Sequence, residues 1–115
     1  MQISADSGSG STARIALTGK LDINGAETIA IPLAALSGAK QYVVIDMSGV
    51  SFLASIGIRH LVSATKTLMR RGGRLVLLAP QPPVLDVLTT SGITDLIAVA
   101  ATESDVQSLL GGATA

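Results

Sequence analysis

VVIDMSGVSFLASIGI, residues 43–58, is the stretch of the chain that decides its fold. Tyr42 to Met47 is a nearly continuous apolar run, a pattern typical of a strand covered on both faces. From Ile56 to Arg71, apolar residues recur on one helical face and polar or basic residues on the other. The stretch therefore predicts a central strand of a parallel sheet, a short connection, and an amphipathic helix lying across that sheet.

The segments after this helix continue the alternation of strand and helix. Arg74 to Ala79 is another buried-strand run. Pro82-Pro83 suits the first turn of a further helix, because proline lacks only an N–H that would be unpaired there. Leu96 to Ala100 is expected to form a last strand, and Thr102 is expected to cap a final helix.

The segments before residue 42 predict a hairpin and a first helix. Gln2 to Ala5 and Ala13 to Thr18 have strand character, and a Gly/Ser-rich turn separates them. Asn24 and Glu27 have the spacing of a capping box, which predicts where the helix begins. Pro32 falls inside this helix, so we expect either a kink or a late start with Pro32 in the first turn.

This order of elements predicts a single α/β domain. A hairpin followed by alternating helices and strands requires crossovers around a mostly parallel sheet, with about four helices packed on it. We expect residues 1–110 to form the domain and 111–115 to be a disordered tail.

Composition excludes several classes of function. The 115 residues carry eight basic and eight acidic side chains, and this balance is unlike that of a general nucleic-acid binder. Hydrophobic residues make up 48%, but their unbroken runs are far shorter than the roughly 20 residues of a membrane-spanning helix. The absence of cysteine rules out disulfides and thiolate metal sites and fits the reducing cytosol. We expect a cytoplasmic protein that neither binds nucleic acid nor inserts into a membrane.

The inventory of catalytic side chains is thin. His60 is the single histidine, and we expect it to be a solvated helix residue. Asp22, Asp46 and Asp86 are far apart in sequence, and each has a plain local role at a strand end or on a helix. The glycines match neither a phosphate-binding loop nor a dinucleotide fingerprint. We predict no catalytic residue, metal site or cofactor.

Ser55 is the most informative polar residue, because it lies between an apolar connection and the start of a helix. Periodicity alone favours a structural role as helix N-cap. A helix N-terminus also favours a negative group, so a phosphate on Ser55 is a second interpretation. One hydroxyl can serve both roles.

Nearly the whole chain resembles the STAS domain family. The resemblance rests on the order and spacing of five motifs: LTGKLD (17–22), VVIDMSGVSF (43–52), ASIG (54–57), GRLVL (73–77) and TSGI (90–93). It implies the STAS fold and the type of member known as the anti-sigma factor antagonist, or anti-anti-sigma factor.

The resemblance also implies a role for Ser55. In such antagonists the loop usually reads Asp-Ser-Ser/Thr-Gly, and a partner kinase, which is also the anti-sigma factor, phosphorylates the serine after the aspartate. That serine matches Ser55, whereas Ala54 replaces the aspartate and Ile56 replaces the second hydroxyl residue. The two replacements leave open whether an unusual kinase modifies Ser55 or the chain binds its partner constitutively.

We therefore predict a non-enzymatic partner-switching protein that captures an anti-sigma factor or serine kinase and releases a sigma factor. The predicted binding residues are Asp22, Phe52, Leu53, Ala54, Ser55, Ile56, Gly57, Ile58 and Arg59. A serine phosphatase is a further partner that the resemblance implies. One alternative is a STAS docking subunit of a lipid-transport ABC complex or a stress sensor. A small hydrolase or nucleotide-binding enzyme is a weaker alternative, since the chain has neither a catalytic base beside a nucleophile nor a phosphate-binding loop.

Overall fold

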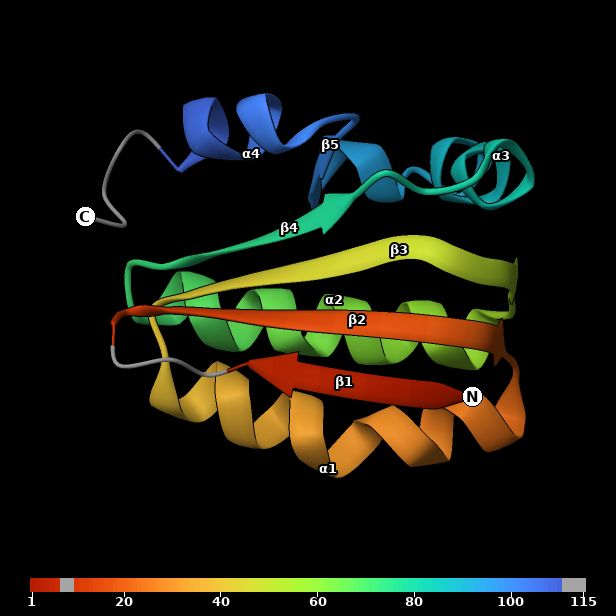
Figure 1. The fold of residues 1–115 in the computed structure, drawn as a ribbon, viewed down its shortest axis with the longest axis horizontal. Helices are drawn as coiled ribbons and strands as arrows, with labels where there is room; N and C mark the ends of the chain where they lie inside the picture. The colour runs from red at the N-terminus through yellow and green to blue at the C-terminus, as the bar shows by residue number, and fades with distance from the viewer. Residues whose placement is uncertain (7–9, 111–115) are drawn as a thin grey trace.

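The computed structural model describes residues 1–6 and 10–110, so the predicted tail at 111–115 lies outside the described residues. Helices and strands alternate after an initial pair of strands (Figure 1). In chain order the elements are β1 (Gln2–Asp6), β2 (Thr12–Leu21), α1 (Ile23–Ala39), β3 (Tyr42–Leu53), α2 (Ser55–Arg70), β4 (Arg74–Leu78), α3 (Pro82–Thr90), the 3-10 turn η1 (Ile93–Asp95), β5 (Ala98–Ala100) and α4 (Glu103–Leu109).

The strands form one five-stranded sheet in the order β1-β2-β3-β4-β5. β1 pairs antiparallel with β2, and every later pair is parallel. This confirms the predicted α/β class, the N-terminal hairpin, and β3 and β4 as interior parallel strands.

The two faces of the sheet are covered unequally, and the hydrophobic pattern follows from that. α1 and α2 lie side by side on one face and bury a core that includes Ile15, Ile45 and Leu77. On the other face α4 covers the β3–β5 half through a second cluster that includes Val44 and Val106. β3 is therefore buried continuously at its start, whereas β2 alternates because its second face is not covered by a helix.

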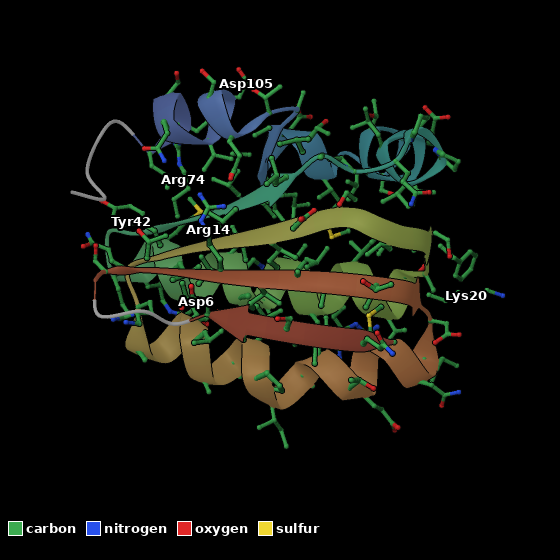
Figure 2. The ribbon with its side chains drawn as sticks, viewed as in Figure 1. Asp6, Arg14, Lys20, Tyr42, Arg74 and Asp105 are labelled. Atoms are coloured by element: carbon green, nitrogen blue, oxygen red, sulfur yellow. The ribbon has the colours of Figure 1, made fainter. Side chains whose placement is uncertain are left out.

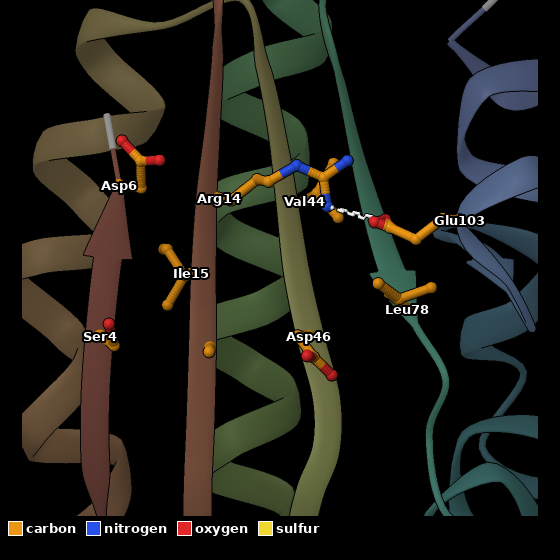
Figure 3. A pocket seen from close by; sticks show the side chains of 9 residues that line it. Ser4, Asp6, Arg14, Ile15, Val44, Asp46, Leu78 and Glu103 are labelled. Atoms are coloured by element: carbon orange, nitrogen blue, oxygen red, sulfur yellow. Dashed lines mark hydrogen bonds and ion pairs between the residues drawn. The ribbon is translucent and has the colours of Figure 1, made fainter. Parts of the chain in front are cut away.

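The uncovered face carries a hollow of about 340 Å³ between β1–β3 and α4 (Figure 3). Arg14 reaches from β2 across β3, and its Nη1 lies 2.8 Å from Glu103 Oε1. The two side chains are 43% and 59% accessible, so solvent screens this ion pair and it adds little stability. It links α4 to the sheet at one side of the hollow, whose lining also includes Val44 and Leu78.

β3 is longer than predicted, and this places the end of the strand far from where the sequence suggested. The expected end at Met47 is wrong, since β3 continues to Leu53. β4 pairs no further along β3 than Asp46, so residues beyond that point pair only with β2. The register with β2 shifts twice along this extension, which breaks the period-2 pattern that sequence analysis relies on.

α1 also begins differently from the prediction. Asp22, not Asn24, is the N-cap, and its carboxylate Oδ1 accepts a hydrogen bond from the amide of Gly25 at 2.9 Å. The helix is assigned without a break through Pro32, so the late start is wrong. A side chain directly after β2 caps the helix, and the capping-box spacing at Asn24 and Glu27 was coincidental.

Two strands in the C-terminal half of the chain, β4 and β5, are shorter than predicted. β4 ends at Leu78 because Ala79 has a φ of 53°, in the left-handed region, where an extended strand cannot continue. β5 begins at Ala98 because η1 occupies Ile93–Asp95 just before it. The predicted cap of α4 is confirmed, since the Thr102 hydroxyl accepts from the amide of Asp105 at 3.2 Å.

Candidate functional site

Two strand-to-helix junctions lie side by side at one end of the sheet. β2 runs into α1 and β3 runs into α2, and Leu21 and Leu53 pair in register at the two strand ends. The amide of Ala54 donates to the carbonyl of Leu21 at 3.0 Å, which joins the junctions directly. Figure 2 shows Lys20 at this end of the sheet, opposite to Tyr42. In parallel sheets the carboxyl ends of strands are where binding sites gather.

The start of α2 corrects the predicted role of Ser55. Ala54 is the N-cap, with extended backbone, and Ser55 is the first residue of α2. The N-cap therefore has no side-chain oxygen, and the carbonyl of Ala54 accepts from Ile58 at 3.2 Å instead. The sequence favours Ser55 as the cap because serine is a far better N-cap than alanine. The Ser55 side chain is exposed and makes no hydrogen bond to any described residue.

A glycine lets α2 approach the sheet at this point. A Cβ at Gly57 would lie 2.7 Å from Leu21 Cγ, closer than carbon atoms pack, and 3.1 Å from Leu53 Cδ1, which is also tight. Gly25 has the equivalent place in α1, where a Cβ would overlap the carbonyl oxygen of Lys20. The first turns of both helices thus pack directly on the strand ends, and this fixes the position of Ser55.

The predicted binding residues fall into three groups by exposure. Phe52, Ser55 and Arg59 are exposed. Phe52 is 49% accessible, although phenylalanine is usually buried. Asp22, Ala54, Ile56 and Ile58 are half-buried. Leu53 and Gly57 are buried, so they support this surface from beneath rather than offer a side chain to a partner.

Ile23 belongs to the same edge and sequence reasoning missed it. As the first residue of α1 it has the place that Ser55 has in α2, and its side chain is 69% accessible. Exposed apolar side chains at one edge, such as Ile23 and Phe52, are a feature of protein interfaces. The signal that could have found it is the likeness of the two junctions, Leu21 to Gly25 and Leu53 to Gly57.

A shallow hollow of about 410 Å³ continues from Ser55 along the outer flank of α2. It is lined by Ser55, Ile58, Arg59, Val62, Ser63 and Lys66, and we call it the α2 groove. These residues recur every three or four positions, as one exposed side of a helix does. The groove therefore places Ser55 and two cationic side chains on one surface.

The other candidate side chains are not brought to this groove. His60 is half-buried and lines a small cavity with Ala30 and Leu33 of α1, so it is less solvated than expected. Asp46 accepts a hydrogen bond from the amide of Ser48 at 2.9 Å, a local role in β3. Asp86 is exposed on α3. No helix of the described residues is long and apolar enough to cross a bilayer.

The chain belongs to the STAS domain family, whose model matches residues 7–107. Its fold resembles that of the anti-sigma factor antagonist SpoIIAA in its unphosphorylated form, with 25% identity, a TM-score of 0.80, and coverage of 96% of this chain and 97% of that one. The phosphorylated form of SpoIIAA from Bacillus gives a TM-score of 0.71 at 25% identity over 91% of this chain and 96% of that one. Structural similarity therefore points to the anti-sigma factor antagonists within the family.

Two further proteins are similar to this chain, one in fold and one in sequence. An anti-sigma factor antagonist from Mycobacterium paratuberculosis gives a TM-score of 0.82 at 20% identity, over 95% of this chain and 94% of that one. Sulfate transporter 1.3 of Arabidopsis thaliana is 40% identical over 57 residues, which is 50% of this chain and 9% of the transporter. The chain thus spans a small part of the curated relative that it matches.

Proposed function

We propose that this chain is an anti-sigma factor antagonist that binds an anti-sigma factor through the Phe52–Ile58 surface and is switched by phosphorylation of Ser55. The observation that carries the proposal is the position of Ser55 as the exposed first residue of α2, on an edge that also exposes Phe52. The similarity to SpoIIAA in both its forms supports it. Capture of the anti-sigma factor frees a sigma factor, and this chain itself performs no catalysis.

The modification places a charge where the domain tolerates it and the interface does not. In the proposed step, Ser55 Oγ attacks the γ-phosphorus of ATP held by the partner kinase. An O–P bond forms, the bond to the ADP oxygen breaks, and the hydroxyl proton passes to a base on the kinase. The phosphate then stands at the N-terminus of α2, where the helix dipole favours it.

Ala54 gives this chain a distinct start to α2. The position equivalent to Asp22 carries no carboxylate, so the first amides of α2 lack a side-chain cap. A phosphate on Ser55 therefore meets uncapped N–H groups and no neighbouring N-cap anion on its own helix. The replacement of the usual aspartate favours the phosphorylated state electrostatically, while it removes one carboxylate that a kinase would otherwise recognise.

Phosphate transfer tests the proposal directly. The kinase encoded nearest to this gene is incubated with the chain and ATP, and the modified residue is located by peptide mass spectrometry. One phosphate on Ser55, absent from Ser55→Ala protein and retained by Ser108→Ala protein, is the expected result. Incorporation at another serine, or none from any kinase that binds the chain, would contradict the switch. A serine phosphatase from the same organism is expected to remove the group.

A second function is favoured by one observation, the 40% identity to a sulfate transporter over 57 residues. In that case the same surface docks the chain onto another subunit of a transport or sensor assembly. The two functions are separated by the partner recovered with tagged protein at native expression. A kinase-type anti-sigma factor supports the antagonist, and a transporter subunit supports the docking role.

A further inference from the structure

The basic side chains around α2 are not equivalent. No acidic residue lies between Asp46 and Asp86, whereas five basic residues do. Three of these five cations have partners within the protein.

Arg71 Nη1 donates to the carbonyls of Ser37 and Lys40 at 2.7 Å, and so caps the end of α1. Arg74 Nη1 donates to the carbonyl of Leu109 at 2.9 Å, and Arg70 Nη2 to Thr67 Oγ1 at 3.4 Å.

Arg59 and Lys66 are the two that remain. Neither makes an ion pair or side-chain hydrogen bond within residues 1–6 and 10–110. Both are exposed, and both line the α2 groove. Because α2 itself contains no aspartate or glutamate, nothing on the helix offsets their charge. The groove therefore has a cationic rim that the fold does not use.

The floor of the groove is apolar. Ile58 and Val62 are half-buried and pack against the main core, so each keeps part of its surface open to the groove. Met69 continues the same flank toward the end of α2 and is 56% accessible. From Ser55 to Lys66 the groove covers three helical turns, a length of about 16 Å at 1.5 Å per residue. This is the footprint of a short helix.

We propose that the α2 groove binds an acidic amphipathic helix of the partner protein, and that a phosphate on Ser55 acts by engaging Arg59 in place of that helix. Leucine-like side chains of the partner cover Ile58 and Val62, and its carboxylates meet Arg59 and Lys66. The inference rests on the proposed function, since it names the partner chemistry of the same surface.

The spacing of Ser55 and Arg59 supports the second half of the proposal. The two residues are four positions apart on α2 and line the same hollow, so they face the same side of the helix. A phosphoserine pairs strongly with a guanidinium through charge-assisted hydrogen bonds. The phosphate thus withdraws one of the two free cations and repels the carboxylates of the partner helix.

A defined peptide tests the groove without the native partner. The probe is a synthetic peptide of about 18 residues, long enough to cross the groove, with leucines at helical spacing on one face and glutamates on the other. It is titrated into isotope-labelled protein and followed by amide chemical shifts. We expect saturable shifts at Ser55, Arg59, Val62 and Lys66. A scrambled peptide of the same composition is expected to bind at least about tenfold more weakly.

Matched variants assign the binding to the two free cations. The double variant Arg59→Glu/Lys66→Glu should weaken binding of the peptide at least about tenfold, whereas Arg14→Glu, on the face of the sheet away from α2, should change it less than about twofold. Ser55→Asp should weaken binding of the peptide when Arg59 is present, and should weaken it much less in protein that also carries Arg59→Gln. The proposal would be overturned if the scrambled peptide bound equally well, if the chemical-shift changes centred on residues outside the groove, or if the double variant bound the peptide as tightly as native protein.

The outcomes separate this inference from the proposed function. If the peptide fails but Ser55→Asp still releases the anti-sigma factor, the antagonist role stands and the acidic-helix inference is wrong. If the peptide binds as expected while the anti-sigma factor ignores the charge at Ser55, the groove stands and the phosphorylation switch is wrong.

Discussion

Leu21 and Leu53 pair in register at the ends of β2 and β3, so α1 and α2 begin next to each other. The pairing brings Asp22, capping α1, to the same edge of the sheet as Ser55, the first residue of α2. The candidate site is thus a consequence of sheet register rather than of any one loop. Its parts differ in one respect, because the first helix has a side-chain cap and the second does not.

That difference predicts the effect of Ala54→Asp. The backbone at Ala54 is already extended, as an N-cap requires, so the new carboxylate can accept from the uncapped amides of α2. We expect the free energy of unfolding to rise by about 0.5 to 2 kcal/mol. Urea denaturation measures it, and Asp22→Ala, which removes the existing cap of α1, should lower it by a similar amount. No gain from Ala54→Asp would mean that the start of α2 is satisfied by water alone.

Two glycines provide a second prediction with opposite signs. Gly57→Ala puts a methyl group against Leu21 and Leu53, and we expect a loss of about 1 to 3 kcal/mol from overpacking. Gly38→Ala on α1 meets nothing within 4 Å, so we expect a gain of up to about 1 kcal/mol from helix propensity. Chemical denaturation of both variants measures the two changes in unfolding free energy. Equal effects would show that α2 does not pack closely on the strand ends.

The orientation of α2 makes a third prediction. Leu61 is fully buried, so Leu61→Ala should cost about 2 to 5 kcal/mol of unfolding free energy. Lys66 is exposed and unpaired within the described part of the chain, so Lys66→Ala should change it by less than about 0.5 kcal/mol. Thermal and urea unfolding provide the comparison. Similar losses for the two variants would place the wrong face of α2 against the sheet.

Much of this fold follows from the sequence, for identifiable reasons. A continuous apolar run predicts the buried strand at Tyr42 to Met47, and apolar residues that repeat every three or four positions predict the amphipathic helix at Ile56 to Arg71. The two patterns differ because the strand is buried on both faces and the helix on one. The extension of β3 to Leu53 is not predictable in this way, since two register shifts with β2 break the alternation there. The start of α2 was misplaced because local preference favours Ser55 as a cap, and tertiary pairing of Leu53 puts Ala54 there instead.

The site was only partly visible for a similar reason. The sequence points to Ser55 and Phe52, but the place of Ile23 at the same edge depends on the pairing of strands that are remote in sequence. Likewise, all five basic residues between Asp46 and Asp86 look alike as letters. The packing of α1 and α4 engages Arg71 and Arg74 and leaves Arg59 and Lys66 free. Charge counts cannot show such a division.

The most direct test of the central claim is isothermal titration of the anti-sigma factor with native, Ser55→Ala and Ser55→Asp protein. Within the domain, a negative group at the start of α2 gains about 0.3 to 1 kcal/mol, so Ser55→Asp should fold normally by thermal unfolding. In the complex the same charge would be buried in an interface that includes the exposed Phe52 and the half-buried Ile56, where its desolvation costs several kcal/mol.

Since about 1.4 kcal/mol is tenfold in affinity, Ser55→Asp should weaken binding by at least about one order of magnitude, while Ser55→Ala binds nearly normally. Undiminished binding by correctly folded Ser55→Asp protein would contradict the account and reduce Ser55 to the first residue of a helix.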